Sequence, residues 1–281
     1  MGLLAVKALL APSFVVAASL AARRYGPWLG GLIGGLPVVA GPILLIYALA
    51  HGERFAAQAA LGALLGLISL SAFGVAYGRL AARMAGRAAW PLCTLAGWAA
   101  FGAGTAALDG FSPPAGVALA VVLGSFVAGV WLLAGTARGD AGAAEVRLPA
   151  WDLPVRALCA LVLVLVLTAV AGSLGPKLSG LLAPFPVIAT VLATFTHSQL
   201  GARATAHLLR GLLTGYGAFA LFCFALAVGL PALGVAGAFA LASVGAVTAQ
   251  ALVIVATRAR PAVLGSPLRA RCAAEPEEAA A

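Results

Sequence analysis

The sequence predicts an all-α, polytopic helical membrane protein of about nine transmembrane helices, arranged as two inverted-topology repeats. Hydrophobic residues make up 63% and charged residues 9% of the 281 residues, and the mean hydropathy is +1.08. Soluble domains contain roughly 45–50% apolar and 25% charged residues. The apolar runs approach the roughly 20 residues that cross a bilayer as a helix, and they lack the alternation of membrane β-strands.

An internal repeat with an offset of 149 residues divides the chain into two halves. Residues 26–38 read GPWLGGLIGGLPV, and residues 175–187 read GPKLSGLLAPFPV. The same offset, without a gap, places Arg54 on Arg203. Other identical pairs are Val6 and Val155, Gly62 and Gly211, Gly66 and Gly215, and Phe73 and Phe222. Matches of Gly, Pro and Arg indicate a duplication better than matches of the abundant Ala and Leu do.

Apolar runs between charged and Gly/Pro-rich segments predict the individual spans. They cover residues 3–22, 27–50, 54–78, 89–107, 115–135, 155–174, 177–196, 203–229 and 231–256. The first span is expected to be a membrane helix and not a signal peptide, because it aligns with an internal span. The predicted organisation is a first repeat over residues 1–108, a linking helix and cytoplasmic loop over 109–153, a second repeat over 154–257 and a disordered cytoplasmic tail over 258–281.

Positive charges predict the orientation of these spans. Fourteen Lys or Arg residues follow odd-numbered spans, whereas Lys7, Arg54 and Lys177 lie on the other side. Cytoplasmic loops concentrate Lys and Arg, so the N-terminus is expected outside and the C-terminus inside. The spans that open the two repeats would then enter from opposite sides. The fourteen are Arg23, Arg24, Arg79, Arg83, Arg87, Arg138, Arg147, Arg156, Arg203, Arg210, Arg258, Arg260, Arg269 and Arg271.

Inverted repeats favour a secondary transporter, because two halves related by an in-plane pseudo-twofold axis can open to alternate sides. We therefore expect a small-solute transporter or facilitator of a bacterial inner membrane, a location inferred from the compact, Ala/Arg-rich and Lys-poor chain. A non-transporting membrane scaffold or assembly partner is the alternative, because architecture does not prove chemistry. A membrane enzyme acting on lipid is less favoured, since no Walker loop, HExxH motif, nucleophile elbow or paired catalytic carboxylates occur in the sequence.

The second span of each repeat carries prolines at matching depth, namely Pro37 and Pro42 in one and Pro184 and Pro186 in the other. A proline inside a helix removes a backbone donor and frees a carbonyl, which in a membrane needs another partner. We predict a substrate site at the membrane centre, although a kink with glycine-mediated packing is the alternative. Its predicted residues are Gly34, Gly35, Pro37, Gly41, Pro184, Pro186, Thr190 and Thr194.

Three polar residues are candidates for gating or proton relay. Gln58 and His207 are equivalent in the repeat, and each precedes a GxxxG seam that predicts close helix packing. Polar residues inside a membrane are functional candidates, but both lie about one turn into their helices, so an interfacial position is favoured. His197 lies in the polar segment TFTHSQ at the end of a span. It is expected at the interface, with proton relay as the alternative.

The remaining polar residues restrict the chemistry. All the acidic residues are expected in loops or tails, so no intramembrane carboxylate is predicted: Glu53, Asp109, Asp140, Glu145, Asp152, Glu275, Glu277 and Glu278. The cysteines lack CxxC spacing and a nearby His cluster, so no metal or cofactor is predicted: Cys93, Cys159, Cys223 and Cys272. No basic face interleaved with aromatic residues points to nucleic acid. The expected partners are the lipid bilayer and a small neutral or anionic solute, with a homo-oligomer left open.

Overall fold

The computed structural model describes residues 2–38, 40–84, 86–136, 151–171 and 181–264, and over these residues the chain is all-helical. This agrees with the all-α part of the predicted fold class. The helices are α1 (Gly2–Tyr25), α2 (Pro27–Gly34), α3 (Ala40–His51), α4 (Glu53–Arg83), the short 3-10 helix η1 (Arg87–Ala89), α5 (Trp90–Leu108), α6 (Ala115–Ala134), α7 (Asp152–Ala171), α9 (Val187–Leu200) and α10 (Ala202–Leu264). α10 consists of two limbs that meet at Gly234, whose φ is 68°.

Several helices have the length and composition of membrane spans. Among the described residues, four are long and apolar enough to cross a bilayer: Glu53–Arg83, Trp90–Leu108, Ala115–Ala134 and Ala202–Thr257. Large apolar side chains point outward, as on α6, where Val127 is 71% and Trp131 75% exposed. Such an outer surface is unfavourable in water but matches hydrocarbon. The chain is therefore compatible with a helical membrane protein.

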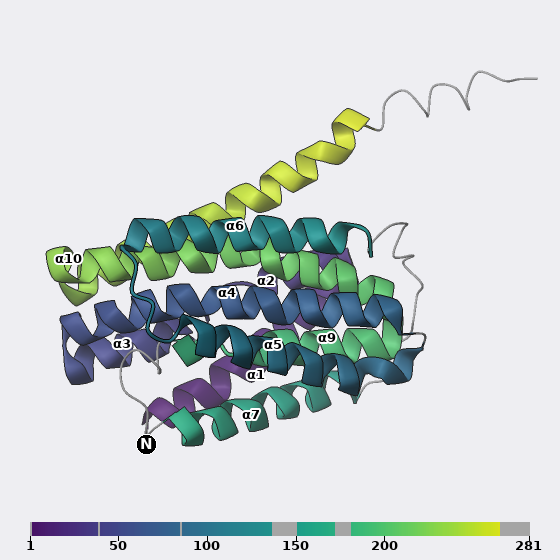
Figure 1. The fold of residues 1–281 in the computed structure, drawn as a ribbon, viewed down its shortest axis with the longest axis horizontal. Helices are drawn as coiled ribbons and strands as arrows, with labels where there is room; N and C mark the ends of the chain where they lie inside the picture. The colour runs from purple at the N-terminus through teal and green to yellow at the C-terminus, as the bar shows by residue number, and fades with distance from the viewer. Residues whose placement is uncertain (1, 39, 85, 137–150, 172–180, 265–281) are drawn as a thin grey trace, which may run out of the picture.

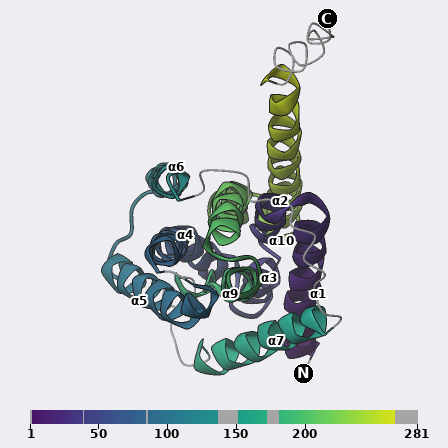
Figure 2. The ribbon, with the colours of Figure 1, turned by 90° about the vertical axis from the view of Figure 1, so that its right-hand side faces the viewer.

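α4 and the first limb of α10 form the centre of the bundle, where they pack against each other. Gly74 of α4 lies beside Leu213 of α10, and Gly78 lies beside Leu209. Residue numbers therefore rise along one helix as they fall along the other, so the two helices are antiparallel. α5 and α6 pack against α4 on its outer side, whereas α1, α7 and α9 gather on the other side (Figure 2).

Charged residues collect at one end of this bundle, on the right in Figure 1. α1 and α9 end there and α7 begins there, and the side chains of Arg23 and Gln199 both donate to the carboxylate of Asp152. We call this the arginine-rich end. At the opposite end, the bend at Gly234 lies beside Glu53, the first residue of α4. The C-terminal limb of α10 packs on the bundle as far as Gln250, whose amide donates to the carbonyl of Leu32, and then projects from it (Figure 1).

The helix boundaries differ from the predicted ones at several places, and α4 and α9 both end later than predicted, at Arg83 and Leu200. The predicted span over 27–50 is divided into α2 and α3, α7 starts at Asp152 instead of residue 155, and α10 continues to Leu264 although the tail was expected from residue 258. The predictions for the loop over 137–150, for Lys177 and for the tail over 265–281 lie outside the described residues.

Two sharp bends of the backbone between helices occur at positions 149 residues apart. Gly52 and Gly201 each separate two helices, with φ of 87° and 85°. The N–H of Gly52 donates to the carbonyl of Ala48 at 3.1 Å, and the N–H of Gly201 donates to the carbonyl of His197 at 3.0 Å. Glycine adopts positive φ at no steric cost, which explains why the residue is glycine in both halves.

Candidate functional site

Both halves of the chain contain an interrupted helix where the prolines predicted one. α2 ends at Gly34 and α3 begins at Ala40. In the second half residues 181–182 are helical, residues 183–186 are not, and α9 begins at Val187. The two interruptions occupy equivalent positions of the repeat.

The backbone hydrogen bonds of the two interruptions are also equivalent. In the first half the donor and acceptor pairs are Leu36–Ile33, Val38–Leu36 and Gly41–Pro37, at 3.2, 2.8 and 2.9 Å. In the second half they are Phe185–Leu182, Val187–Phe185 and Thr190–Pro186, at 2.9, 2.7 and 2.8 Å. The middle bond of each set closes a three-residue turn around a proline. Pro186 has φ −73° and ψ 49°, close to an inverse γ-turn, which the proline ring favours because it fixes φ near −65°.

The two interruptions line one cavity of about 40 Å³. Pro37 and Pro186 both contribute to its wall, and so do Ala40 and Ala189, which are equivalent in the repeat. Tyr216 of α10 also lines the cavity and is 5% exposed. A space of this size holds about three water molecules. The lining is otherwise apolar, so backbone groups and one phenol are the polar groups that a bound molecule could meet.

Each interrupted helix packs on the glycine seam of the other half. A Cβ atom on Gly215 would collide with the carbonyl oxygen of Leu32, and a Cβ on Gly66 would collide with the carbonyl oxygen of Leu181. Leu32 and Leu181 are equivalent in the repeat, and so are Gly66 and Gly215. Each half thus makes the same leucine-to-glycine contact with the other half. Close approach of the backbones is the role that the GxxxG pattern predicted.

The predicted substrate residues are divided between two spaces. Gly34, Pro37, Pro184 and Pro186 line the cavity. Gly35 instead packs on the backbone of Gly215, and Gly41 adjoins the ring of Phe222.

Thr190 and Thr194 face a separate groove between α5, α7 and α9. Thr190 accepts a hydrogen bond from the indole N–H of Trp98 at 3.0 Å. These two threonines therefore do not join the cavity residues, because successive residues of α9 turn to different faces of the helix.

The three gating candidates do not form one site. Gln58 is exposed near the start of α4, and His207 is partly buried near the start of α10. His197 is fully buried among side chains of the protein and lies in the last turn of α9, the helix end at which it was expected. Its Nδ1 lies 3.3 Å from the hydroxyl of Tyr77, and its Nε2 has no hydrogen-bond partner among the described residues.

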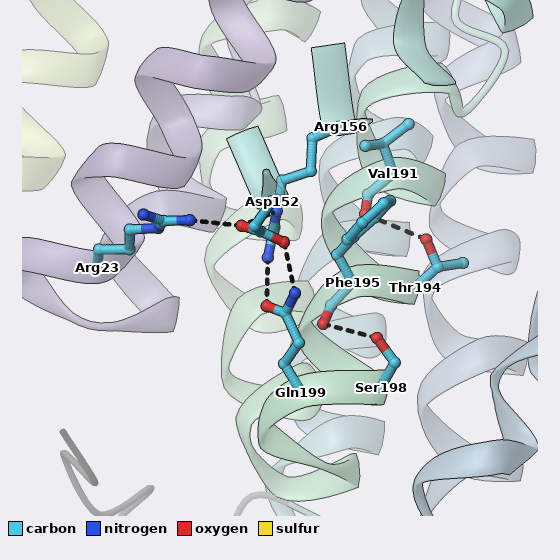
Figure 3. Close-up of polar contacts among 8 residues, drawn as sticks. All are labelled: Arg23, Asp152, Arg156, Val191, Thr194, Phe195, Ser198 and Gln199. Carbon is cyan, nitrogen blue, oxygen red and sulfur yellow. Dashed lines mark hydrogen bonds and ion pairs between the residues drawn. The ribbon is translucent and has the colours of Figure 1, made fainter. Parts of the chain in front are cut away.

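A buried charged cluster joins α1, α7 and α9 at the arginine-rich end (Figure 3). Asp152 is 0% exposed, and its carboxylate accepts hydrogen bonds from Arg23, Arg156 and Gln199. Arg156 also donates to the side-chain oxygen of Gln199 at 2.8 Å. Its guanidinium lies 4.8 Å from the ring centre of Phe195. The cluster holds two cations and one anion, so it carries a net positive charge.

The expectation that Glu53 and Asp152 lie in loops is wrong, because α4 begins at Glu53 and α7 begins at Asp152. Asp152 and Arg156 are four residues apart, a spacing that pairs charges on a helix, so one contact was visible in the sequence. Arg23 and Gln199 lie 129 and 47 residues away from Asp152. No local pattern could have revealed them.

The described residues contain no group of three or more His, Cys, Asp or Glu side chains that could hold a metal ion. The thiols of Cys93, Cys159 and Cys223 are free and lie on three different helices, α5, α7 and α10. Cys272 lies outside the described residues. No protein-family model, curated protein or solved structure matches the chain.

Proposed function

We propose that the chain is a small-solute transporter or facilitator that works by alternating access of two inverted repeats. The observation that carries the proposal is the pair of interrupted helices with equivalent backbone hydrogen bonds that line one cavity. Inverted-repeat carriers place their substrate sites at discontinuous helices near the bilayer midplane. The repeats are proposed to cover residues 1–108 and 154–257, as the sequence predicts.

The antiparallel packing of α4 and the first limb of α10 supports the inverted relation. The two helices carry equivalent glycine seams, with Gly66 in one and Gly215 in the other. Equivalent helices that are antiparallel would cross a membrane in opposite directions. We count α2 and α3 as one span and the limbs of α10 as two, which gives nine spans under this proposal. We place the N-terminus outside and the arginine-rich end in the cytoplasm, where Lys and Arg concentrate.

The cavity favours a neutral or anionic solute. α3 and α9 both begin at it, since Ala40 and Ala189 lie in their first turns and line its wall. Helix N-termini carry partial positive charge from unpaired N–H groups. At about 40 Å³ the cavity is smaller than a metabolite, so under the proposal the two halves must move apart before a solute can bind. The cluster around Asp152 would act as the lock that closes the arginine-rich end.

A binding screen followed by uptake tests this proposal. Purified protein is screened for thermal stabilisation by a metabolite library, and each hit is tested for uptake into proteoliposomes. Ala40→Leu and Ala189→Leu each fill the cavity, so each should abolish uptake of a transported hit. Ala128→Leu is the control, because Ala128 is exposed on α6.

Two outcomes would contradict the proposal. Full uptake by both cavity variants would place the site elsewhere. A compound that stabilises the protein but is never translocated would favour the scaffold alternative.

A further inference from the structure

A groove of about 520 Å³ lies between α5, α7 and α9, on the side of the bundle away from α6 (Figure 2). Trp90 and Trp98 of α5 form one wall, and Val162 of α7 forms part of the other. Thr190 and Ser198 mark its two ends along α9. Trp98 and Phe185, whose ring centres are 6.0 Å apart, separate the groove from the cavity at the interruptions.

The groove presents an apolar surface, although hydroxyl groups line it. Thr94 donates to the carbonyl of Trp90 at 2.8 Å, Thr194 donates to the carbonyl of Thr190 at 2.8 Å, and Ser198 donates to its own helix at 3.1 Å. These hydroxyl hydrogens are therefore used within the protein. A hydrocarbon chain could fill the space without leaving these three donors unsatisfied.

The length of the groove matches one leaflet of a bilayer. It extends along α5 from Trp90 to Trp98, a helix rise of about 12 Å. The hydrocarbon core of a bilayer is about 30 Å thick, so one leaflet contributes about half of that. Because Trp90 and Ser198 lie at the arginine-rich end, the groove runs from that end toward the centre.

The end of the groove at Trp90 and Ser198 lies at the arginine-rich end, where Arg83 is exposed at the end of α4. Phe195, which lines the groove, contacts the guanidinium of Arg156, which is buried and bonded to Asp152 and Gln199. Among the described residues, the carboxylate at this end is that of Asp152, which is buried and paired. Basic sites between membrane helices bind anionic lipid headgroups.

We propose that this groove binds one acyl chain of an anionic phospholipid from the leaflet at the arginine-rich end. The chain lies between α5, α7 and α9, and the phosphate faces the arginines. This site does not depend on solute transport, since it requires only that the helices lie in a bilayer.

Quenching of tryptophan fluorescence tests the site directly. The full-length protein with Trp28, Trp131 and Trp151 replaced by phenylalanine retains Trp90 and Trp98 as reporters. Two sets of phosphatidylcholine vesicles are prepared, one with chain-brominated phosphatidylglycerol and the other with chain-brominated phosphatidylcholine at the same mole fraction. The protein is placed in each set, and the quenching is compared. Brominated phosphatidylglycerol should be preferred about fivefold for each arginine that contacts the phosphate, and high salt should reduce this preference.

Matched variants separate the groove from the general lipid shell. Val162→Phe fills the groove and should remove the preference, whereas Val127→Phe on the far helix α6 should retain it; the two valines are 50% and 71% exposed. Equal quenching by the two brominated lipids, or an unchanged preference in Val162→Phe, would overturn the proposal.

Native mass spectrometry provides a second measurement on the unaltered chain. Protein released from vesicles of equimolar phosphatidylglycerol and phosphatidylcholine should retain one phosphatidylglycerol. Retention of both lipids in equal amounts, or of neither, would contradict the site.

Discussion

The centre of the molecule makes the same contacts at positions 149 residues apart, whereas its arginine-rich end does not. At the centre, Leu32 packs on Gly215 and the equivalent Leu181 packs on Gly66. The prolines, the turn hydrogen bonds and the cavity wall repeat in the same way. Five positions that line the cavity from the first half have counterparts that line it from the second: Gly34, Leu36, Pro37, Ala40 and Leu70.

The charged cluster has no such counterpart. The positions 149 residues before Asp152 and Gln199 hold Leu3 and Ala50, which can neither accept nor donate a side-chain hydrogen bond. The difference teaches that the two halves share backbone hydrogen bonds, whereas the buried charged contacts occur at one end of the described bundle. Under the transport proposal, the repeated centre lets the halves exchange conformations, and the unique end makes the two conformations unequal in energy.

Asp152→Asn should have the largest effect, because it breaks the contact that is not repeated. Arg156 is 4% exposed and would lose its only charged partner among the described residues. Removing one member of a buried ion pair costs about 3–5 kcal/mol. The free energy of unfolding in detergent micelles, measured by denaturant titration, should fall by this amount.

Asp109→Asn is the matched control, since Asp109 is exposed and its substitution should change the stability by less than about 0.5 kcal/mol. If the two variants lose equal stability, the buried cluster does not hold this end together.

Gly66→Ala and Gly215→Ala should have smaller and mutually equal effects, because each places a methyl group against the carbonyl of the other half. Overpacking of this kind costs about 1–3 kcal/mol. Gly217→Ala serves as the control, because a Cβ there meets nothing within 4 Å. The same denaturant titration applies. A loss in one glycine variant alone would show that the centre is not energetically duplicated.

Much of the fold could be predicted from local patterns. Apolar runs place the helices because a bilayer requires long apolar segments, and Pro37 and Pro186 place the interruptions because proline cannot continue the hydrogen-bond ladder. The glycine seams were likewise visible, since Gly66 and Gly215 lie on a regular helical spacing.

The candidate site was predicted less completely, because side-chain orientation and long-range partners decide it. Thr190 follows Ala189 directly, yet the helix turns one toward the groove and the other toward the cavity. The burial of His197 depends on Tyr77, which lies 120 residues away. Asp152 was expected in a loop because its charge placed it before the predicted start of the apolar span. Its hydrogen-bond partners on α1 and α9 allow it to begin a helix in a buried position.

Arg54 and Arg203 allow the central proposal, that the repeats are inverted, to be tested most directly. They are equivalent in the repeat, and both are exposed. In a chain whose native cysteines are replaced by serine, Arg54→Cys and Arg203→Cys are labelled in separate variants with a membrane-impermeant maleimide, added to either face of oriented vesicles. Inverted repeats predict that the two variants are labelled from opposite faces, with Arg83→Cys labelled from the same face as Arg203→Cys. Labelling of Arg54→Cys and Arg203→Cys from one face would contradict the account.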